Sequence, residues 1–241
     1  MSESTIATPG TGGHFRPVEV EPENAAGRLA ALLREELLSA RYPPGERLKE
    51  EELAARFRTG RYTVRAALRI LVSSGLLDHR PNRGASVPLL TRDRVNEVSA
   101  YREVLEVGAL RLALQRQADL DAFVAATRAL ERLPDDAPWI DVVETHQAIH
   151  TSLLVAAGND RLLAAYLLCE EELRYIVSTV RPDFTAGRLA ALHTRLLAGI
   201  HCGGDAAVTA LEADLHTGRQ AVLDALPHPE HAPDEAGPGV R

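Results

Sequence analysis

Residues 56–69 read RFRTGRYTVRAALR, and this stretch decides the fold of the first part of the chain. It contains five arginines and no acidic residue: Arg56, Arg58, Arg61, Arg65 and Arg69. Read as a helix from Gly60, it places the last three of them on one face. A second stripe, which can face a core, contains Val64, Leu68 and Leu71. The cationic face indicates either binding of a polyanion or a solvated surface in a chain whose single lysine is Lys49.

Charge is divided unevenly along the chain. The 241 residues are enough for two domains, and 45% of them are hydrophobic but only 4% aromatic, which favours a helical core of Leu, Ala and Val. The net charge is -7. Residues 21–90 contain 12 Lys+Arg and 9 Asp+Glu, or +3, whereas residues 91–241 contain 14 and 23, or -9. A basic part followed by an acidic part predicts two functions, one of them directed at a polyanion.

Several classes of protein are excluded by what the sequence lacks. The two cysteines, Cys169 and Cys202, lie far apart and form neither a disulfide framework nor a Cys-based zinc motif. No apolar run reaches the roughly 18–20 residues that a membrane span needs. Residues 1–13 lack the apolar core of a signal peptide. We expect a soluble, cytoplasmic protein without a membrane partner.

The first 90 residues predict a winged helix-turn-helix. Residues 1–20 are rich in Ser, Thr, Gly and Pro and are expected to form a flexible arm. Residues 21–90 show three helical segments, at 23–40, 50–57 and 61–74. Two short apolar runs then flank the turn signal Pro81-Asn82-Arg83-Gly84, which predicts a two-stranded hairpin. The third helix fits a major groove, and the hairpin tip can approach the DNA backbone or the minor groove.

These residues carry a resemblance to a known family. The segment YPPGERLKEEELAARF, the VRAALRILVSSGLLDHR that follows and the PNRGASV wing resemble the DNA-binding domain of the GntR family of bacterial transcription regulators. The resemblance covers residues 25–90 and implies that Arg61, Thr63 and Arg65 read the operator, with Gly84 at the wing. The whole set expected at the DNA is Arg56, Arg58, Arg61, Tyr62, Thr63, Arg65, Arg83 and Gly84.

The chain departs from the family pattern at the start of the third helix. Gly60 stands where Ser or Thr is common, so a capping hydroxyl is missing. Tyr62 and Thr63 replace a common Thr-Pro pair, and Ala66 replaces a Glu. Glu51 stands where some relatives have a DNA-contacting Arg. We expect these departures to alter the operator sequence more than the act of binding.

The rest of the chain is acidic and helical. Residues 91–226 predict a bundle of six or seven helices, whose interior is a natural ligand site. Six helical segments are separated by Pro, Gly and Asn, at about 92–116, 118–132, 139–157, 160–180, 186–202 and 205–226. Residues 227–241 are expected to form a disordered tail. The expected fold is therefore mainly α.

Four histidines fall on three of these helices. His146 and His150 form an HxxxH pair, which can share one metal ion because they lie one turn apart. His193 and His216 lie in the middle of two later helices, among leucines. Each of the last two, taken alone, is as readily explained as a satisfied core residue. The four together indicate a site for a divalent metal, zinc or alternatively nickel.

Residues 92–220 resemble the helical FCD effector domain of the FadR-like branch of the same family. The motifs are Arg102-x-x-x-Glu106, HQAIHTSLLVAAGN from His146 and HTRLLAGI from His193. The branch often binds a divalent metal through an Asp and three His. The resemblance implies that His150, His193 and His216 match those histidines. With four neutral histidines as ligands, the ion keeps its full charge, so we expect stronger binding of an anionic effector.

Arg102 is the expected effector-binding residue. In the family register it points into the bundle, where its guanidinium can hold a carboxylate through two hydrogen bonds. The alternative is an ion pair with Glu106, four residues later, and both can hold in different ligation states.

The sequence as a whole predicts a ligand-responsive regulator. The family resemblance implies that it is a repressor. A homodimer would bind a pseudo-palindromic operator, and a small carboxylate would change the spacing of its two recognition helices. A metal-sensing regulator is the alternative. A metal-dependent hydrolase is disfavoured because neither Glu144 nor Glu170 sits in an HExxH-type arrangement. We therefore expect no enzymatic activity.

Overall fold

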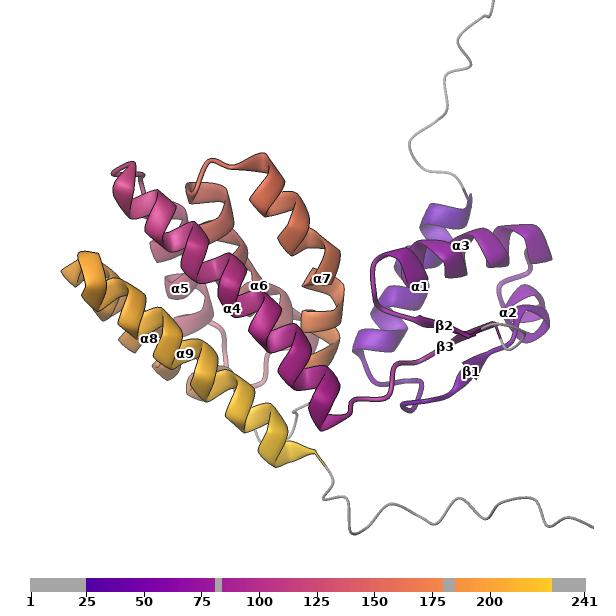
Figure 1. Cartoon of the computed structure of the whole chain (residues 1–241). Helices are drawn as coiled ribbons and strands as arrows, with labels where there is room; N and C mark the ends of the chain where they lie inside the picture. Colours follow the sequence, from indigo (N-terminus) through magenta and orange to yellow (C-terminus); the bar gives the residue numbers. More distant parts are fainter. Residues whose placement is uncertain (1–24, 81–83, 180–184, 227–241) are drawn as a thin grey trace, which may run out of the picture.

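The computed structural model describes residues 25–80, 84–179 and 185–226. They form a small domain with three helices and a sheet, followed by a bundle of six helices (Figure 1). The expected fold class, mainly α with a winged helix-turn-helix before a helical bundle, is confirmed. The expected arm, the expected tail and Arg83 lie outside the described residues. Among the described helices, none has the length and apolar composition that a membrane crossing requires.

The winged-helix domain differs from expectation in its sheet. Its elements in chain order are α1 (Ala25–Leu38), β1 (Arg47–Leu48), α2 (Glu50–Arg56), α3 (Arg61–Ser73), β2 (Asp78–Arg80) and β3 (Gly84–Ser86). The sheet has three strands in the order β1-β3-β2, all antiparallel, rather than the two of a simple hairpin. The additional strand β1 has only two residues, too short for an alternating pattern to be visible in the sequence.

Helix α3, the expected recognition helix, is held in place by its apolar stripe. Val64, Ala67, Leu68 and Leu71 are buried against α1, while the opposite side of the helix is exposed. Its N-cap is Gly60, which makes no side-chain cap hydrogen bond, as its missing hydroxyl implies. The arginines of α3 therefore project from a helix that is fixed by core packing rather than by capping.

The bundle follows the expected helical segments closely. Its helices are α4 (Arg92–Gln115), α5 (Asp121–Glu131), α6 (Trp139–Ala156), α7 (Asp160–Thr179), α8 (Ala186–Cys202) and α9 (Gly204–Ala225). Gly203, with φ +69, caps α9 and turns the chain back after α8. Asp205 lies in the first turn of α9, where its charge favours the helix dipole, rather than at the N-cap. A Cβ at Gly199 would overlap that of Ala210, so this glycine lets α8 and α9 approach closely.

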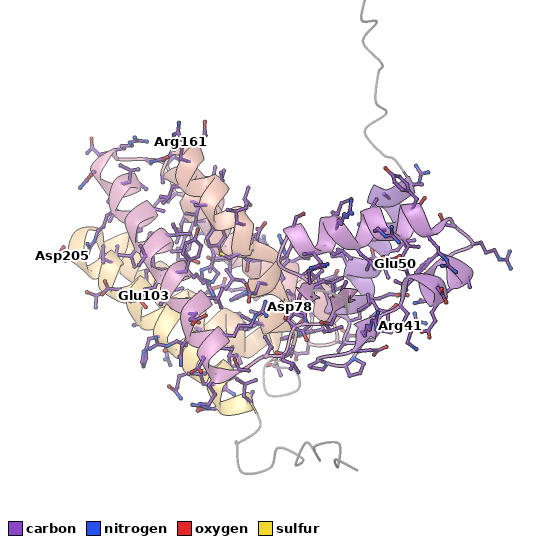
Figure 2. All side chains as sticks on the ribbon, turned by 45° about the vertical axis from the view of Figure 1, so that its right-hand side comes forward. Arg41, Glu50, Asp78, Glu103, Arg161 and Asp205 are labelled. Atoms are coloured by element: carbon purple, nitrogen blue, oxygen red, sulfur yellow. The ribbon has the colours of Figure 1, made fainter. Side chains whose placement is uncertain are left out.

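The two domains contact each other through α7. Tyr175 of α7 is buried in the core of the winged-helix domain, and its hydroxyl donates to the Pro88 carbonyl at 3.2 Å. Arg34 of α1 binds Glu144 and Glu171, both at 2.7 Å. A second bridge joins Arg94 of α4 to Glu172 of α7 and to Asp78 of β2, which lies between the domains in Figure 2. The bundle is therefore connected to the wing and to α1 by oriented polar contacts.

Candidate nucleic-acid interface and metal centre

The exposed face of α3 holds the two arginines expected to read DNA. Arg65 forms an ion pair with Glu50 of α2, with both carboxylate oxygens within 3.3 Å of its guanidinium nitrogens. Arg61 pairs with the neighbouring Glu51 at 2.9 Å. Both arginine side chains are more than half exposed. Exposed pairs of this kind are weak, so the arginines can exchange these carboxylates for phosphates or base edges.

The other residues expected to contact DNA differ in how exposed their side chains are. Tyr62 is 86% exposed at the start of α3, and Thr63 beside it is half-buried. Arg58 is exposed in the turn before α3, with φ +50. Gly84 opens β3 with φ +76, and nothing in the described chain lies within 4 Å of where its Cβ would be. Arg58, Tyr62, Thr63 and Gly84 therefore lie on or next to the exposed surface formed by the start of α3 and the wing.

Arg56 is engaged within the domain. Its guanidinium forms an ion pair with Glu36 of α1, donates to the Tyr42 hydroxyl at 2.7 Å and lies 4.7 Å above the Phe57 ring. The network joins α2 to α1. A phosphate contact by Arg56, as expected from the sequence, would require this network to rearrange.

The two glutamates of α2 lead to a prediction about DNA affinity. In Glu50→Gln/Glu51→Gln, the arginines of α3 lose their carboxylate partners, and two negative charges leave the surface that would face phosphates. We expect operator affinity to rise roughly five-fold. The measurement is fluorescence anisotropy with a duplex selected from random-sequence DNA by the wild-type protein.

Glu52→Gln is the matched control for that experiment. Glu52 lies on the same helix but pairs with Lys49 rather than with α3. We expect it to change affinity by less than about two-fold. Equal tightening by Glu52→Gln and by the double variant would show a general charge effect and contradict the specific role of Glu50 and Glu51.

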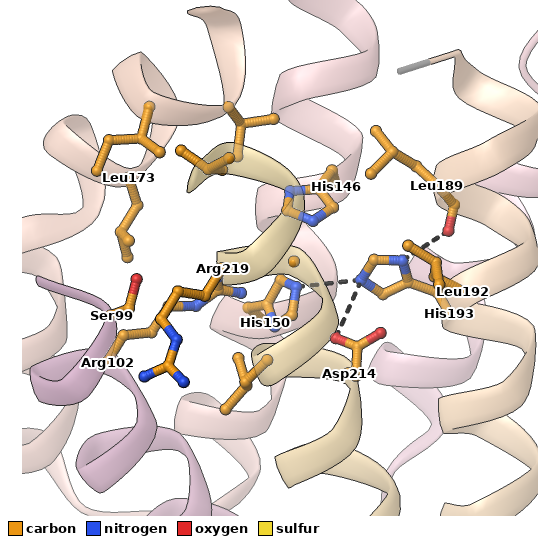
Figure 3. A pocket seen from close by; sticks show the side chains of 15 residues that line it. Ser99, Arg102, His146, His150, Leu173, Leu189, Leu192, His193, Asp214 and Arg219 are labelled. Carbon is orange, nitrogen blue, oxygen red and sulfur yellow. Dashed lines mark hydrogen bonds and ion pairs between the residues drawn. The ribbon is translucent and has the colours of Figure 1, made fainter. Parts of the chain in front are cut away.

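Three buried histidines converge inside the bundle. His146 and His150 of α6 and His193 of α8 have ring centroids 4.9 to 5.1 Å apart. One ligand nitrogen from each ring lies within 4.8 Å of the others. Figure 3 shows the three imidazoles directed toward one another. The spacing expected from HxxxH is thus present, and α8 contributes the third ring.

Hydrogen bonding fixes the tautomers of two of these rings. His193 Nδ1 lies 2.8 Å from the Leu189 carbonyl, which can only accept, so this nitrogen carries the proton. His150 Nδ1 lies 2.8 Å from Glu106 Oε2. Burial alone would raise the pKa of the Glu106 carboxyl, but Arg102 and His150 bring it to about 2, so it too accepts. In the neutral rings both Nε2 atoms therefore carry lone pairs.

Those two lone pairs face each other, which is the arrangement of a cation site. The Nε2 atoms of His150 and His193 lie 3.1 Å apart. Two nitrogens bound to one tetrahedral zinc are separated by about 3.3 Å, given Zn–N bonds of roughly 2.0–2.1 Å. Burial lowers the pKa of His193, which disfavours the alternative of a proton shared between the rings. The residues present therefore fit a divalent metal.

His146 completes the case for a ligand set. Burial lowers its pKa well below the usual value, so the ring is neutral near pH 7. Its Nδ1 is buried and has no hydrogen-bond partner among the described residues. A buried, unpartnered nitrogen is costly unless something binds it. One ring nitrogen of His146 lies within 4.8 Å of ligand nitrogens of His150 and His193, as a shared cation would require.

Asp214, rather than the expected His216, lies beside the three histidines in the structure. Asp214 Oδ2 lies 3.8 Å from His193 Nε2, and its side chain is 8% exposed. His216 is exposed and lies outside the cluster. The reason is helical register: Leu211 and Leu215 set the buried side of α9, and His216 lies about 200° round the helix from Asp214. His216 instead accepts a hydrogen bond from Arg219 at 3.1 Å.

Asp214 also changes the expected charge of the ligand set. The sequence implied four neutral histidines, whereas the structure brings three histidines and one carboxylate together. The carboxylate is on α9 instead of α6. Asp214 lies on the Leu211–Leu215 side of α9, so its inward position could have been predicted from the spacing of these residues in the sequence.

An ion pair between Arg102 and Glu106 lies next to the histidine cluster. Arg102 Nε donates to Glu106 Oε1 at 2.6 Å, and Glu106 binds His150 through its other oxygen. The expected Arg102–Glu106 ion pair is therefore present. Arg102 Nη2 is nevertheless buried without a hydrogen-bond partner in the described part of the chain. One edge of this guanidinium orients Glu106, and the other remains able to bind an anion.

The histidines and Arg102 share one cavity of about 60 Å³ (Figure 3). Ser99 and Arg219 add polar groups to its lining. The apolar part of its wall consists mainly of Leu173, Ile176, Val177, Leu189, Leu192 and Val222. A cluster of three histidines, a guanidinium and an apolar wall between them suit a small organic acid.

Helix α7 connects this cavity to the winged-helix domain. Leu173, Ile176 and Val177 line the cavity. Between them in sequence, Tyr175 reaches the winged-helix core, and Arg174 binds Glu144 and Glu171, the two glutamates that also hold Arg34. Adjacent side chains of one helix therefore contact the cavity and the DNA-binding domain.

Comparison with known proteins identifies the family. Residues 25–87 match the family described as bacterial regulatory proteins, gntR family, and residues 97–217 match the FCD domain. The chain belongs to the GntR family of bacterial regulators, with an FCD domain after its winged helix. Members of this family are DNA-binding transcription regulators and not enzymes.

Individual relatives agree with this assignment. The Nta operon transcriptional regulator of Aminobacter aminovorans is 30% identical over 57% of this chain, which spans 66% of the relative's length. The probable D-xylose utilization operon transcriptional repressor of Paenarthrobacter nicotinovorans is 26% identical, over 70% of this chain and 75% of that protein. A GntR regulator structure from Rhodococcus sp. RHA1 has the same fold, with a TM-score of 0.70 at 22% identity, covering 84% of this chain and 99% of that one.

Proposed function

We propose that the chain is a ligand-responsive repressor whose bundle binds one divalent metal and a small carboxylate. The observation that carries the proposal is the shared cavity. Ring nitrogens of three histidines and the Asp214 carboxylate converge there, beside a buried guanidinium edge that has no partner among the described residues. A carboxylate effector would satisfy Arg102 and approach the metal at the same time.

His146, His150, His193 and Asp214 would hold the metal, zinc or alternatively nickel. Three nitrogen ligands and one oxygen ligand suit either ion. The bound ion would supply a Lewis-acidic position for one carboxylate oxygen. Glu106 keeps the Nε2 lone pair of His150 directed at the site, and the Leu189 carbonyl does the same for His193.

At the DNA end, Arg61, Thr63 and Arg65 would read base edges, while Arg58 and Tyr62 would contact the backbone. Gly84 of the wing would contribute a further contact, as would Arg83, which lies outside the described residues. A homodimer would place two such surfaces on a pseudo-palindromic operator. Doubling the contacts would offset the small net charge of +3 on residues 21–90.

The effector would act on DNA binding through α7. A carboxylate that packs against Leu173 and Ile176 bears on the helix that also carries Arg174 and Tyr175. A change in α7 then alters the Arg34 contacts of the winged helix and the spacing of the recognition helices. Such coupling requires that the effector bind the DNA-competent and DNA-released states with different affinity.

A thermal-shift screen of small carboxylates, with and without zinc or nickel, tests this function. We expect metal to stabilise the protein and at least one acid to add stabilisation only when metal is present. Metal stabilisation with no response to any acid would favour a metal-sensing regulator. No response to either metal would contradict the proposed centre.

A further inference from the structure

Gly218 leaves a space in the wall of the cavity that the histidines share with Arg102. It lies inside α9 and lines the cavity together with Asp214 and Val222, which lie one turn before it and one turn after it. A Cβ built on Gly218 would meet no atom of the described chain within 4 Å. Glycine is a poorer helix former than alanine, and neither packing in the described chain nor a positive φ calls for it here. The missing side chain therefore leaves room for a bound molecule.

The polar groups of this cavity suit a molecule with a single carboxylate. Two buried polar atoms in its wall have no hydrogen-bond partner among the described residues, Arg102 Nη2 and His146 Nδ1. The proposed function gives the first to a carboxylate and the second to a metal ion. The Arg219 guanidinium is held toward His216 on the exposed side of α9, 3.1 Å away, and Ser99 provides one hydroxyl. A second carboxylate would have no buried cation of its own, and several hydroxyl groups would be buried without partners, which is costly.

The rest of the wall is mainly aliphatic, and the cavity is small. Leu173, Ile176, Leu192 and Val222 belong to this wall, and the volume of the cavity is about 60 Å³. An apolar cavity that binds benzene has a volume of about 150 Å³, so a benzene ring is larger than the space available here. A short aliphatic chain suits both the size and the lining of the cavity.

We propose that the effector is an aliphatic monocarboxylic acid of roughly three to five carbon atoms, and that its chain lies over Gly218. This rests on the proposed function and names the class of its effector. The carboxylate would lie beside Arg102, and the aliphatic chain would extend along α9 from Asp214 toward Val222. Gly218 is then the residue that sets which acids fit, because a side chain there would occupy the space of the bound chain.

Isothermal titration calorimetry of the zinc-loaded protein tests the class of acid. The probes are butyrate, benzoate, succinate and gluconate, which all carry a carboxylate but differ in size, charge and number of hydroxyl groups. We expect butyrate to bind at least about ten-fold more tightly than each of the other three. Tighter binding by an aromatic, dicarboxylic or sugar acid would overturn the inference and leave the proposed function intact. Binding by no acid, in this series or in the thermal-shift screen, would contradict the proposed function itself.

Gly218→Ala and Gly218→Val test the position of the aliphatic chain. We expect butyrate affinity to fall about five-fold with alanine and at least about fifty-fold with valine, because each added carbon atom fills part of the cavity. Alanine also strengthens α9, so the melting temperature of the acid-free Gly218→Ala protein should rise by about 1–4 °C. Zinc affinity should stay within about two-fold of wild type, since Gly218 has no side chain to offer the metal.

Gly187→Ala is the matched control for these variants. Gly187 is an exposed glycine in the first turn of α8 that does not line the cavity, and the only atom near its added Cβ is Thr185 Oγ1, at 4.0 Å. We expect this variant to bind butyrate as tightly as wild type. Unchanged butyrate affinity in Gly218→Ala and Gly218→Val, or an equal loss in Gly187→Ala, would show that the acid does not lie over Gly218.

Discussion

Replacing His150 by alanine is expected to lower the zinc affinity of the chain by at least about a hundred-fold. His150 provides one of the two Nε2 atoms that face each other at 3.1 Å, and it is the residue that Glu106 orients. Its removal takes away a ligand and leaves the Glu106 carboxylate with Arg102 alone. Competition for zinc with a chromophoric chelator measures the effect.

A control variant at another histidine of the bundle tests whether the loss of affinity comes from a general loss of structure. His201→Ala changes an exposed histidine of α8 and is expected to leave zinc affinity unchanged. Circular dichroism of His150→Ala should show the wild-type helix content. A folded His150→Ala protein that binds zinc as tightly as wild type would reject the histidine cluster as the metal centre.

The same assay separates Asp214 from His216. Asp214→Asn removes the charge that approaches His193 at 3.8 Å, and we expect roughly ten-fold weaker zinc binding. His216→Ala should bind zinc within about two-fold of wild type, because His216 contacts Arg219 on the exposed side of α9. The opposite ranking would restore the ligand set implied by family resemblance.

Arg65→Ala is expected to weaken operator binding by roughly ten- to a hundred-fold. Arg65 lies on the exposed face of α3, where its guanidinium can exchange the Glu50 carboxylate for a base edge. If it reads a base, the loss is large for the selected operator and small for unrelated DNA. Anisotropy titrations with both duplexes, at one fixed salt concentration, distinguish the two.

Arg69→Ala is the matched control for Arg65→Ala. Arg69 is an exposed arginine one turn further along α3, toward the end that a groove-bound helix holds away from the bases. We expect a loss of no more than about three-fold, similar for both duplexes. Equal losses for the two variants would indicate charge alone, and wild-type binding by Arg65→Ala would reject α3 as the reading helix.

The helices were predictable because each has its own local signals. Stripes of arginine and leucine mark α3, and Pro, Gly and Asn mark the breaks between the bundle helices. The helix bounds predicted from these signals lie within about three residues of those observed for most elements. Strand β1 was not predictable, since two residues show no periodicity and its pairing with β3 depends on how the loop after α1 returns to the sheet.

The site was predictable only where ligands lie on one helix. His146 and His150 follow from i, i+4 geometry, but His193 joins them only through packing of α8 against α5 and α9. The contact of Glu106 with His150 joins α4 to α6 and leaves no trace in local sequence. His216 shows the limit of positional resemblance, because two residues along a helix turn a side chain from the buried side to the exposed one.

Control of DNA binding by the bundle cavity can be measured as the operator affinity of the protein with its effector site filled. The probe is whichever acid most stabilises the zinc-loaded protein in the thermal-shift screen. We predict that saturating acid weakens operator binding by the zinc-loaded wild type at least about five-fold and leaves His150→Ala unaffected. An acid that stabilises the wild type but leaves its operator affinity unchanged, or that shifts both proteins equally, would contradict this control of DNA binding.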